Sequence, residues 1–529
     1  MNADLRSALR VLPEYLGQHV LLSAAALALG VAVSLPLLIA ARRSARVRWP
    51  VLALASLIQT VPSLALLALF YPLLLGLSAL LHRLVGWSFS PLGFLPSLLA
   101  LTLYSILPIL RNGITAILNL DPAIVQAALG VGMTSHQRLL RVELPLTAPM
   151  LMAGVRTAAV WVIGTATLAT PVGQTSLGNY IFTGLQMENW VWVLFGCGAA
   201  VALALVTDQL LALVGFGLTR RRPALTWLGL AALLAGVAAA GGLQLRTTSQ
   251  GGYVVGAKNF PEQYILAALI AQRVRATGHP VTERTGLGSS LAFQALAANE
   301  LDVYVDYSGT LWNDVLHRTD TVSRGVMLSD LRTALRRRYG VELLGALGFE
   351  NAYVLAMRSG EARRLGVRTI ADLARVAPQL RLGGDLEFFA RPAWRDLERR
   401  YGLHFRALRQ YEPTFMYRAL LSHEVDVISA FSSDGRIAAD HLTVLSDPLH
   451  VIPPYDAVIL LSPRRAHDPV LRAALKPLVG AIPIGLMRRA NDMVDRARDK
   501  RTAGEAADWL AQAAHLHQDA TAPGVIPRR

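Results

Sequence analysis

The sequence predicts a chain in two parts, an α-helical membrane domain followed by an α/β domain. Hydrophobic residues make up 53% of the 529 residues and charged residues only 16%, and the apolar excess lies almost wholly before Leu245. After that point, short β-like runs alternate with helical patterns, which is typical of α/β folds. Residues 253–517 of this half number 265, which is large for one core, so two lobes with a cleft between them are expected.

Six stretches in the first half qualify as membrane spans, because a spanning helix needs about 20 mostly apolar residues. The second stretch is long and contains Pro62 and Pro72, so it is either one kinked helix or a helix followed by a re-entrant piece. The sixth resembles a signal peptide in composition, but its place in mid-chain favours an uncleaved anchor. The expected spans are residues 18–41, 50–81, 91–110, 150–170, 191–218 and 224–243.

Arginine placement predicts the orientation of these spans in a plasma or inner membrane. Arg residues follow the first span at 42–48, the third at 138–141 and the fifth at 220–222. Basic loops stay cytoplasmic, so the N-terminus and everything after the sixth span should lie outside. The expected domains are a membrane domain at 1–222 containing a loop at 122–146, a sixth span and linker at 223–252, an outer domain at 253–517 and a disordered tail at 518–529.

The loop between the third and fourth spans carries the first recognisable motif, VQAALGVGMTSHQRLLRVELPL at residues 125–146. It resembles the cytoplasmic coupling loop of ABC importer permeases, with Gln126 and Val142 in place of the usual Glu and Ile. Glycine permits a positive-φ turn and proline suits a helix start. The alternative is a plain amphipathic connector. The resemblance implies contact with a separate ATPase subunit and a permease homodimer, and it assigns coupling to Gln126, Ala127, Ala128, Gly132, Leu144 and Pro145.

The second half resembles the substrate-binding proteins of osmoprotectant ABC importers, which have the two-lobed, type II periplasmic-binding-protein fold. Six ordered segments carry this resemblance across residues 253–514. They are Lys258–Gln263, Gly286–Leu296, Asp306–Thr310, Glu387–Pro392, Phe431–Arg436 and Pro453–Tyr455. The resemblance implies a ligand such as glycine betaine, choline, carnitine or ergothioneine.

The family resemblance also implies which residues hold that ligand. A quaternary ammonium has no hydrogen to donate, so aromatic faces bind it through cation–π attraction. Tyr307, Tyr353, Phe431 and Tyr455 are expected to form this cage. A carboxylate needs donors, and the fork of Arg suits it. Lys258, Thr310 and Arg391 are expected to take the carboxylate, which favours a zwitterion over choline.

Several points stay open at this level. Phe431 stands where relatives commonly have Tyr, and Ala352 interrupts an Asn-Thr-Tyr pattern, so the exact betaine is undecided. Gln263 and Tyr417 are weaker candidates. A membrane-anchored solute sensor is the competing function, although no output domain follows a cytoplasmic loop. Asp208, an intramembrane carboxylate, is expected to serve helix packing or a subunit contact, with translocation as the alternative.

Other classes find no support in the composition. The net charge of +15 is spread over helix ends without a basic stripe interleaved with aromatics, so nucleic-acid binding is not expected. Cys197 is the single cysteine, which excludes a Cys-based metal site. The run GGYVVGAK at 251–258 lacks the Gly-Lys-Ser/Thr of a nucleotide-binding loop. No enzyme, cofactor or metal is therefore expected in this chain.

Overall fold

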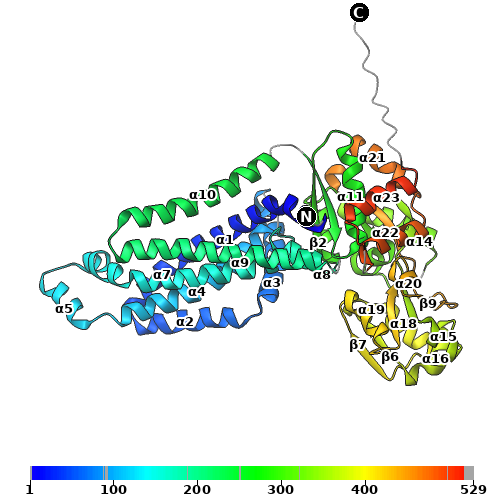
Figure 1. Cartoon of the computed structure of the whole chain (residues 1–529), viewed down its shortest axis with the longest axis horizontal. Helices are drawn as coiled ribbons and strands as arrows, with labels where there is room; N and C mark the ends of the chain where they lie inside the picture. Colours follow the sequence, from blue (N-terminus) through cyan, green and yellow to red (C-terminus); the bar gives the residue numbers. More distant parts are fainter. Residues whose placement is uncertain are drawn as a thin grey trace, which may run out of the picture. The chain divides into compact units, whose positions relative to one another are not determined.

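The computed structural model describes residues 3–86, 89, 93–186, 189–248, 252–320, 322–496 and 499–516. The chain divides into two compact units, one of residues 1–184 and 190–250 and one of residues 185–189 and 251–529 (Figure 1). The tail that the sequence predicts to be disordered lies outside the described residues.

The first unit is entirely helical where it is described (Figure 1). Six of its helices are long and apolar enough to cross a membrane, which confirms the predicted class of this half. Its helices are α1 (Ala3–Arg43), α2 (Ala45–Thr60), α3 (Ser63–Val85), α4 (Phe94–Leu118), α5 (Pro122–Gly130), α6 (Ser135–Arg138), a π-helical turn (Leu139–Glu143), α7 (Leu144–Ala166), a 3-10 turn (Thr167–Val172), α8 (Gly178–Gln186), α9 (Trp190–Thr219) and α10 (Pro223–Thr248).

Three of the predicted spans differ from the observed helices. The second is two helices, because the chain leaves the helical conformation at Val61 and Pro62 between α2 and α3. The first begins at Ala3 rather than residue 18, since its polar start is also helical. The fourth begins at Ser135 rather than residue 150, because the end of the coupling loop runs through the π-helical turn directly into α7.

Close packing around α4 holds the membrane unit together. A Cβ added at Gly154 on α7 would lie 2.8 Å from the Pro108 carbonyl oxygen of α4. One added at Gly30 on α1 would lie 1.8 Å from the Ser105 hydroxyl. Glycine therefore lets both helices approach α4 closely, an arrangement favoured where lipid removes the hydrophobic drive for association.

Asp208 on α9 is paired with Arg156 on α7. Two hydrogen bonds of 2.8 and 2.7 Å join the guanidinium to the carboxylate oxygens. A bidentate pair of this kind satisfies both charges inside a membrane span. The geometry favours helix packing, the first of the roles considered for Asp208.

The second unit is an α/β domain built on two five-stranded sheets, which confirms the predicted two-lobed class. One sheet has the order β2 (Val281–Leu287), β1 (Tyr253–Lys258), β3 (Val303–Tyr307), β10 (Asp456–Leu461), β4 (Glu342–Glu350). The other has the order β7 (Ala407–Gln410), β6 (Arg381–Gly384), β8 (Val427–Phe431), β5 (Tyr353–Arg358), β9 (Leu442–Val444). Parallel pairs dominate one side of each sheet, while β10 and β5 run antiparallel to their neighbours.

Helices surround both sheets and supply the rest of the core. One cluster of buried side chains joins β1, β3 and β10 to α11, α22 and α23 and also includes residues of β5 and β8, while a second cluster packs the other buried residues of β5 and β8 against α19. The helices are α11 (Pro261–Arg275), α12 (Ser289–Ala297), α13 (Ser308–Thr310), a π-helical turn (Leu311–Val315), α14 (Arg324–Tyr339), α15 (Ser359–Leu365), α16 (Ile370–Val376), α17 (Leu386–Ala390), α18 (Pro392–Tyr401), α19 (Pro413–Leu421), α20 (Arg436–Ala439), α21 (Pro469–Leu475), α22 (Ile484–Asp495) and α23 (Ala503–Ala513). The short 3-10 turns are Ala377–Gln379, Pro463–Arg465 and Lys476–Leu478.

Candidate functional site

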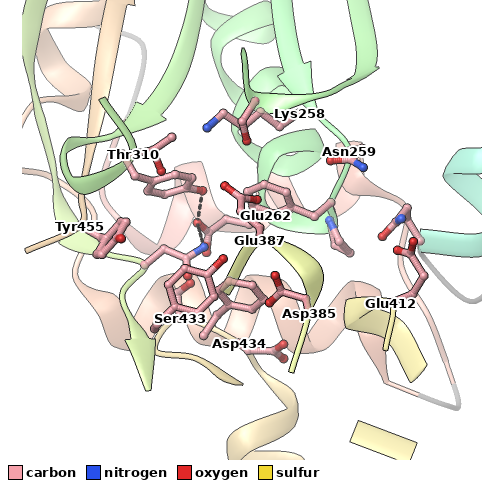
Figure 2. A pocket seen from close by; sticks show the side chains of 18 of the residues that line it. Lys258, Asn259, Glu262, Thr310, Asp385, Glu387, Glu412, Ser433, Asp434 and Tyr455 are labelled. Carbon is pink, nitrogen blue, oxygen red and sulfur yellow. Dashed lines mark hydrogen bonds between the residues drawn. The ribbon is translucent and has the colours of Figure 1, made fainter. Parts of the chain in front are cut away.

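A cavity of about 640 Å³ opens between the two sheets of the α/β domain. Lys258 and Thr310 lie on one side of it, and Asp385, Ser433 and Asp434 lie on the other (Figure 2). Seven residues expected from the sequence to bind ligand all line this cavity, namely Lys258, Tyr307, Thr310, Tyr353, Arg391, Phe431 and Tyr455.

Strand ends bring most of these side chains together. Lys258 ends β1 and Tyr307 ends β3, which are parallel neighbours in the first sheet. Tyr353 starts β5 and lies opposite Phe431 at the end of β8 in the second sheet. Ligands of parallel α/β sheets commonly bind beyond the carboxyl ends of the strands. The fold therefore gathers residues that are far apart in the chain.

Tyr353 is the centre of an aromatic cluster in the cavity wall. Its ring centroid lies 5.0 Å from that of Phe431 and 5.9 Å from that of Tyr455, and the Tyr455 ring is almost perpendicular to it at 87°. Such tilted and edge-on pairs are the favoured aromatic geometries. Tyr307 lies in the other lobe and stacks on Phe260 at 6.1 Å. The four expected cage residues thus form a group of three and a separate fourth.

Arg391 is buried beside this cluster, with 4% of its surface exposed. Its Nη2 atom bonds to Glu387, lies 3.4 Å from an Asp314 carboxylate oxygen and lies 3.4 Å from the Thr310 hydroxyl. Its guanidinium carbon lies 5.6 Å from the ring centroids of both Tyr353 and Tyr455. Its Nε and Nη1 atoms are buried and have no hydrogen-bond partner among the described residues. Two donors are therefore left for an acceptor in the cavity.

Lys258 has a different environment from the one expected. Its ammonium group is buried and forms an ion pair with Asp306, whose other oxygen accepts a 2.5 Å hydrogen bond from Tyr304. The ammonium also lies 5.4 Å from the Tyr307 ring centroid. Lys258 thus has an anionic partner within the protein, whereas the resemblance assigned it to a ligand carboxylate.

Glu262 is a buried cavity residue that the sequence analysis did not single out, although it lies within a recognised motif. Its carboxylate accepts hydrogen bonds from Tyr307 at 2.5 Å, Asn351 at 3.1 Å and Asn491 at 2.9 Å. Burial raises the pKa of Glu262, and these hydrogen bonds oppose the rise. Asn351 lies between β4 and β5, so Glu262 ties the first lobe to a segment that connects the lobes.

The two weaker candidates have structural partners. Gln263 donates a 3.0 Å hydrogen bond to the Tyr307 hydroxyl and so orients that ring. The ring of Tyr417 is buried under the guanidinium of Arg436 at 4.1 Å. Among the described residues, no group of three or more His, Cys, Asp and Glu side chains is placed to hold a metal ion.

Asp385 is a second cavity carboxylate that sequence reasoning did not identify. It precedes α17, and its Oδ1 atom accepts a 2.8 Å hydrogen bond from the backbone N–H of Phe388. Its Oδ2 atom is buried without a hydrogen-bond partner in the part of the chain that the structure describes. Burial raises the pKa of Asp385 to about 6. An Asp directly before a helix is a capping signal in the sequence. Nothing in the local sequence, however, indicates that its second oxygen has no partner.

The predicted coupling segment, residues 122–146, has the local backbone geometry that its motif predicts. Gln126, Ala127 and Ala128 lie on the short helix α5, and Ala128 is buried. Gly132 has a φ of 78°, the left-handed conformation that favours glycine. Leu144 and Pro145 are the first two residues of α7.

A buried carboxylate connects this segment to α1. Glu143 is 4% exposed and ends the π-helical turn. It pairs with Arg138 of α6 at 2.8 Å and with Arg42 in the last turn of α1. Ion pairs therefore join this segment to α1, and the chain continues from it directly into α7.

Comparisons with known proteins match each half of the chain to a transport-protein family. Residues 252–512 match the family described as the substrate binding domain of ABC-type glycine betaine transport systems. Residues 32–221 match the binding-protein-dependent transport system inner membrane component.

Three curated relatives cover different parts of the chain. The choline transport system permease of Bacillus subtilis (strain 168) is 38% identical over 202 residues, which are 38% of this chain and 86% of the relative. A glycine-betaine-binding protein of Pseudomonas aeruginosa is 31% identical over 304 residues, which are 54% of this chain and 94% of the relative. An ergothioneine transport permease/ergothioneine binding protein of Helicobacter pylori (strain G27) is 26% identical over 426 residues, which are 78% of this chain and 74% of the relative. The chain therefore belongs to the osmoprotectant family of binding-protein-dependent ABC importers, in which it fuses the membrane permease and the substrate-binding domain.

Proposed function

We propose that this importer subunit carries a zwitterion with a quaternary ammonium group and a carboxylate, of the glycine betaine type. The observation that supports this most is Arg391, which has two buried, unpartnered donor nitrogens next to the rings of Tyr353 and Tyr455. A carboxylate satisfies those donors. The quaternary ammonium group of the same ligand can then contact the rings of Tyr353 and Tyr455, which lie beside Arg391.

The cage residues contribute through their ring faces. Cation–π contact is worth about 0.5 to 2 kcal/mol per face once water is excluded. Tyr353, Phe431 and Tyr455 supply adjoining rings, and Tyr307 supplies another from the first lobe. Lys258 has a supporting role in this proposal, because its pairing with Asp306 fixes the end of β3 from which Tyr307 extends.

Choline is the second candidate, and one observation favours it. The sequence argument against choline was that two buried cations would repel it, but both cations are paired with carboxylates of the protein. A purely cationic ligand therefore meets less repulsion than the residue types alone suggest. Choline has one hydroxyl oxygen, whereas a carboxylate has two oxygens for the Nε and Nη1 donors of Arg391, so choline satisfies these buried donors less completely.

The test is binding and uptake by the complete importer. Full-length chain and its partner ATPase are reconstituted in vesicles, and uptake of glycine betaine, carnitine, choline and ergothioneine is measured with and without ATP. Carboxylate-bearing betaines should be taken up in an ATP-dependent manner and should bind more tightly than choline. Tighter binding of choline than of every betaine would contradict the zwitterion. Binding without ATP-dependent uptake would favour a solute sensor.

A further inference from the structure

Asp385 presents an acceptor that a simple betaine leaves unused. Only 4% of the residue is exposed, and its Oδ2 atom is buried without a partner among the described residues, while Oδ1 caps α17. Asp385 lines the cavity on the side opposite Lys258 (Figure 2). A buried carboxylate oxygen left unpaired is costly. Neither a trimethylammonium group nor a carboxylate carries a hydrogen to donate to it.

Asp385 and Arg391 flank the same short helix. Asp385 precedes α17 and Arg391 follows it, so the two residues are six positions apart in the chain. At about 1.5 Å per residue, their Cα atoms lie roughly 9 Å apart along a helix. One small ligand can therefore touch both side chains. The unpartnered oxygen of Asp385 can accept a hydrogen bond from a ligand donor, and the unpartnered nitrogens of Arg391 can donate to a ligand acceptor.

Two other buried carboxylates of the cavity, Asp434 and Glu262, have hydrogen-bond partners on both oxygens. Asp434 uses both oxygens in bonds to Arg436, at 2.9, 3.1 and 2.8 Å. Glu262 receives three side-chain donors. Of these three carboxylates, Asp385 is the one with an oxygen that has no hydrogen-bond partner among the described residues.

We infer that the ligand is a betaine that also carries a hydrogen-bond donor, a hydroxyl or a ring N–H, and that Asp385 is the residue that selects for it. The inference rests on the proposed function, since it assumes a carboxylate on Arg391 and an ammonium at the aromatic cluster. A site built to bond a polar hydrogen discriminates strongly against an analogue that lacks it, because the protein group is then left unpaired.

Matched ligand pairs test this with the full-length chain in detergent, by calorimetry. Carnitine differs from γ-butyrobetaine only by its hydroxyl. Histidine betaine and its derivative methylated on the donor ring nitrogen form the second pair, in which a methyl group replaces the hydrogen of the ring N–H. In at least one pair, the donor-bearing member should bind about 10-fold or more tightly, the usual effect of one hydrogen bond to a charged group.

Asp385→Asn is the informative variant. Its side-chain oxygen can still cap α17, since Asn is as good a cap as Asp. Its NH2 group then replaces Oδ2 and faces the ligand donor. The advantage of the donor-bearing member should fall below about 3-fold, at an unchanged melting temperature. Asp434→Asn is the control, and it should alter both members of a pair equally.

The outcomes separate the two proposals. If betaines bind but neither pair shows a preference for the donor, or if Asp385→Asn weakens both members equally, the inference about Asp385 is wrong and the zwitterion stands. If no quaternary ammonium carboxylate binds, the proposed function and this inference fail together.

Discussion

Arg391 is the side chain whose replacement should most directly report the carboxylate end of the site. Arg391→Lys keeps a positive charge for Glu387 and Asp314, but a single ammonium cannot also present two nitrogens to a ligand. Betaine affinity should fall about 10- to 100-fold, the effect of losing one charge-assisted hydrogen bond. Calorimetry on the full-length chain measures this.

Arg436→Lys is the matched control for that substitution. Arg436 also lines the cavity, but its guanidinium is engaged by Asp434. Its replacement should change betaine affinity by less than about 3-fold. Equal losses in the two variants would show that Arg391 has no special role in binding the carboxylate.

The titration of Asp385 predicts a pH dependence of binding. Burial raises its pKa from the ordinary value of 3.8 to about 6, so the ionised fraction grows as the pH rises through 6. A ligand donor bonds better to the ionised form, and affinity for a donor-bearing betaine should therefore increase between pH 5 and pH 7. The raised pKa has the opposite effect on folding, because the folded state binds the proton more tightly than the unfolded state. The free energy of unfolding therefore increases as the pH falls from 6 toward 4.

Affinity measured at pH 5, 6 and 7 checks the binding effect. The same titration on Asp385→Asn should be flat in this range, because the amide does not ionise. A wild-type profile that is also flat, or that falls with rising pH, would contradict the role given to the ionised carboxylate.

At this scale, the sequence motifs predicted residues that share one cavity, but not the ion pairs and hydrogen bonds among them. Seven residues in ordered segments were predicted to share a site, and one cavity brings them together. The partner of Lys258 is 48 residues away, and the Asn491 partner of Glu262 is 229 residues away. Which charge meets which is decided by the register of the sheets, and no local pattern encodes it.

Among the elements, the turn at Gly132 offers a test of the coupling segment. Gly130 and Gly132 both have open space where a Cβ would be, but only Gly132 has a positive φ, of 78°. Gly132→Ala should therefore strain the turn by about 1 to 2 kcal/mol. Gly130→Ala should be neutral or slightly favourable, because Gly130 ends α5.

Uptake and ligand binding should separate in these two variants. Gly132→Ala should reduce ATP-dependent uptake while leaving betaine affinity unchanged, whereas Gly130→Ala should preserve both. Normal uptake by Gly132→Ala would remove the turn from the coupling mechanism, and a loss of ligand affinity would point to general misfolding instead.

Element bounds were less predictable than element types. The break at Pro62 was anticipated as one of two possibilities, since proline lacks the N–H that an uninterrupted helix needs. The early start of α1 was missed, because Arg6, Arg10 and Glu14 lower the apolar signal without breaking a helix. The extension of α7 back through Leu139–Glu143 was missed as well, since the Glu143 carboxylate is neutralised by Arg42 and Arg138, which are read as surface charges in the sequence.

For the whole molecule, the order of the spans fixes which segments share a side of the membrane. Three long apolar helices, α7, α9 and α10, lie between the coupling turn and the α/β domain in the chain. An odd number of crossings puts these two parts on opposite sides. The positive-inside rule places the coupling turn in the cytoplasm and the binding domain outside.

Cysteine labelling tests this topology. In a Cys197→Ser background, a cysteine is introduced either at Ser135 in α6 or at Ser329 in α14, both of which are exposed. A membrane-impermeant maleimide should label Ser329→Cys in spheroplasts and Ser135→Cys only in inside-out vesicles. Labelling of both from one side would overturn the span count.

The last prediction concerns stoichiometry. Each chain contributes only one set of permease helices, and the permease resemblance implies that two such sets enclose the pathway, with an ATPase on each coupling segment. The functional complex should therefore hold two copies of this chain, and so two tethered binding domains. A short flexible tether keeps a binding domain at an effective concentration of about millimolar.

Two copies carrying different affinity tags, expressed together, should be recovered together after two successive purifications, while copies mixed after separate purification should not. If the transport-active material never carries both tags, one chain suffices for transport.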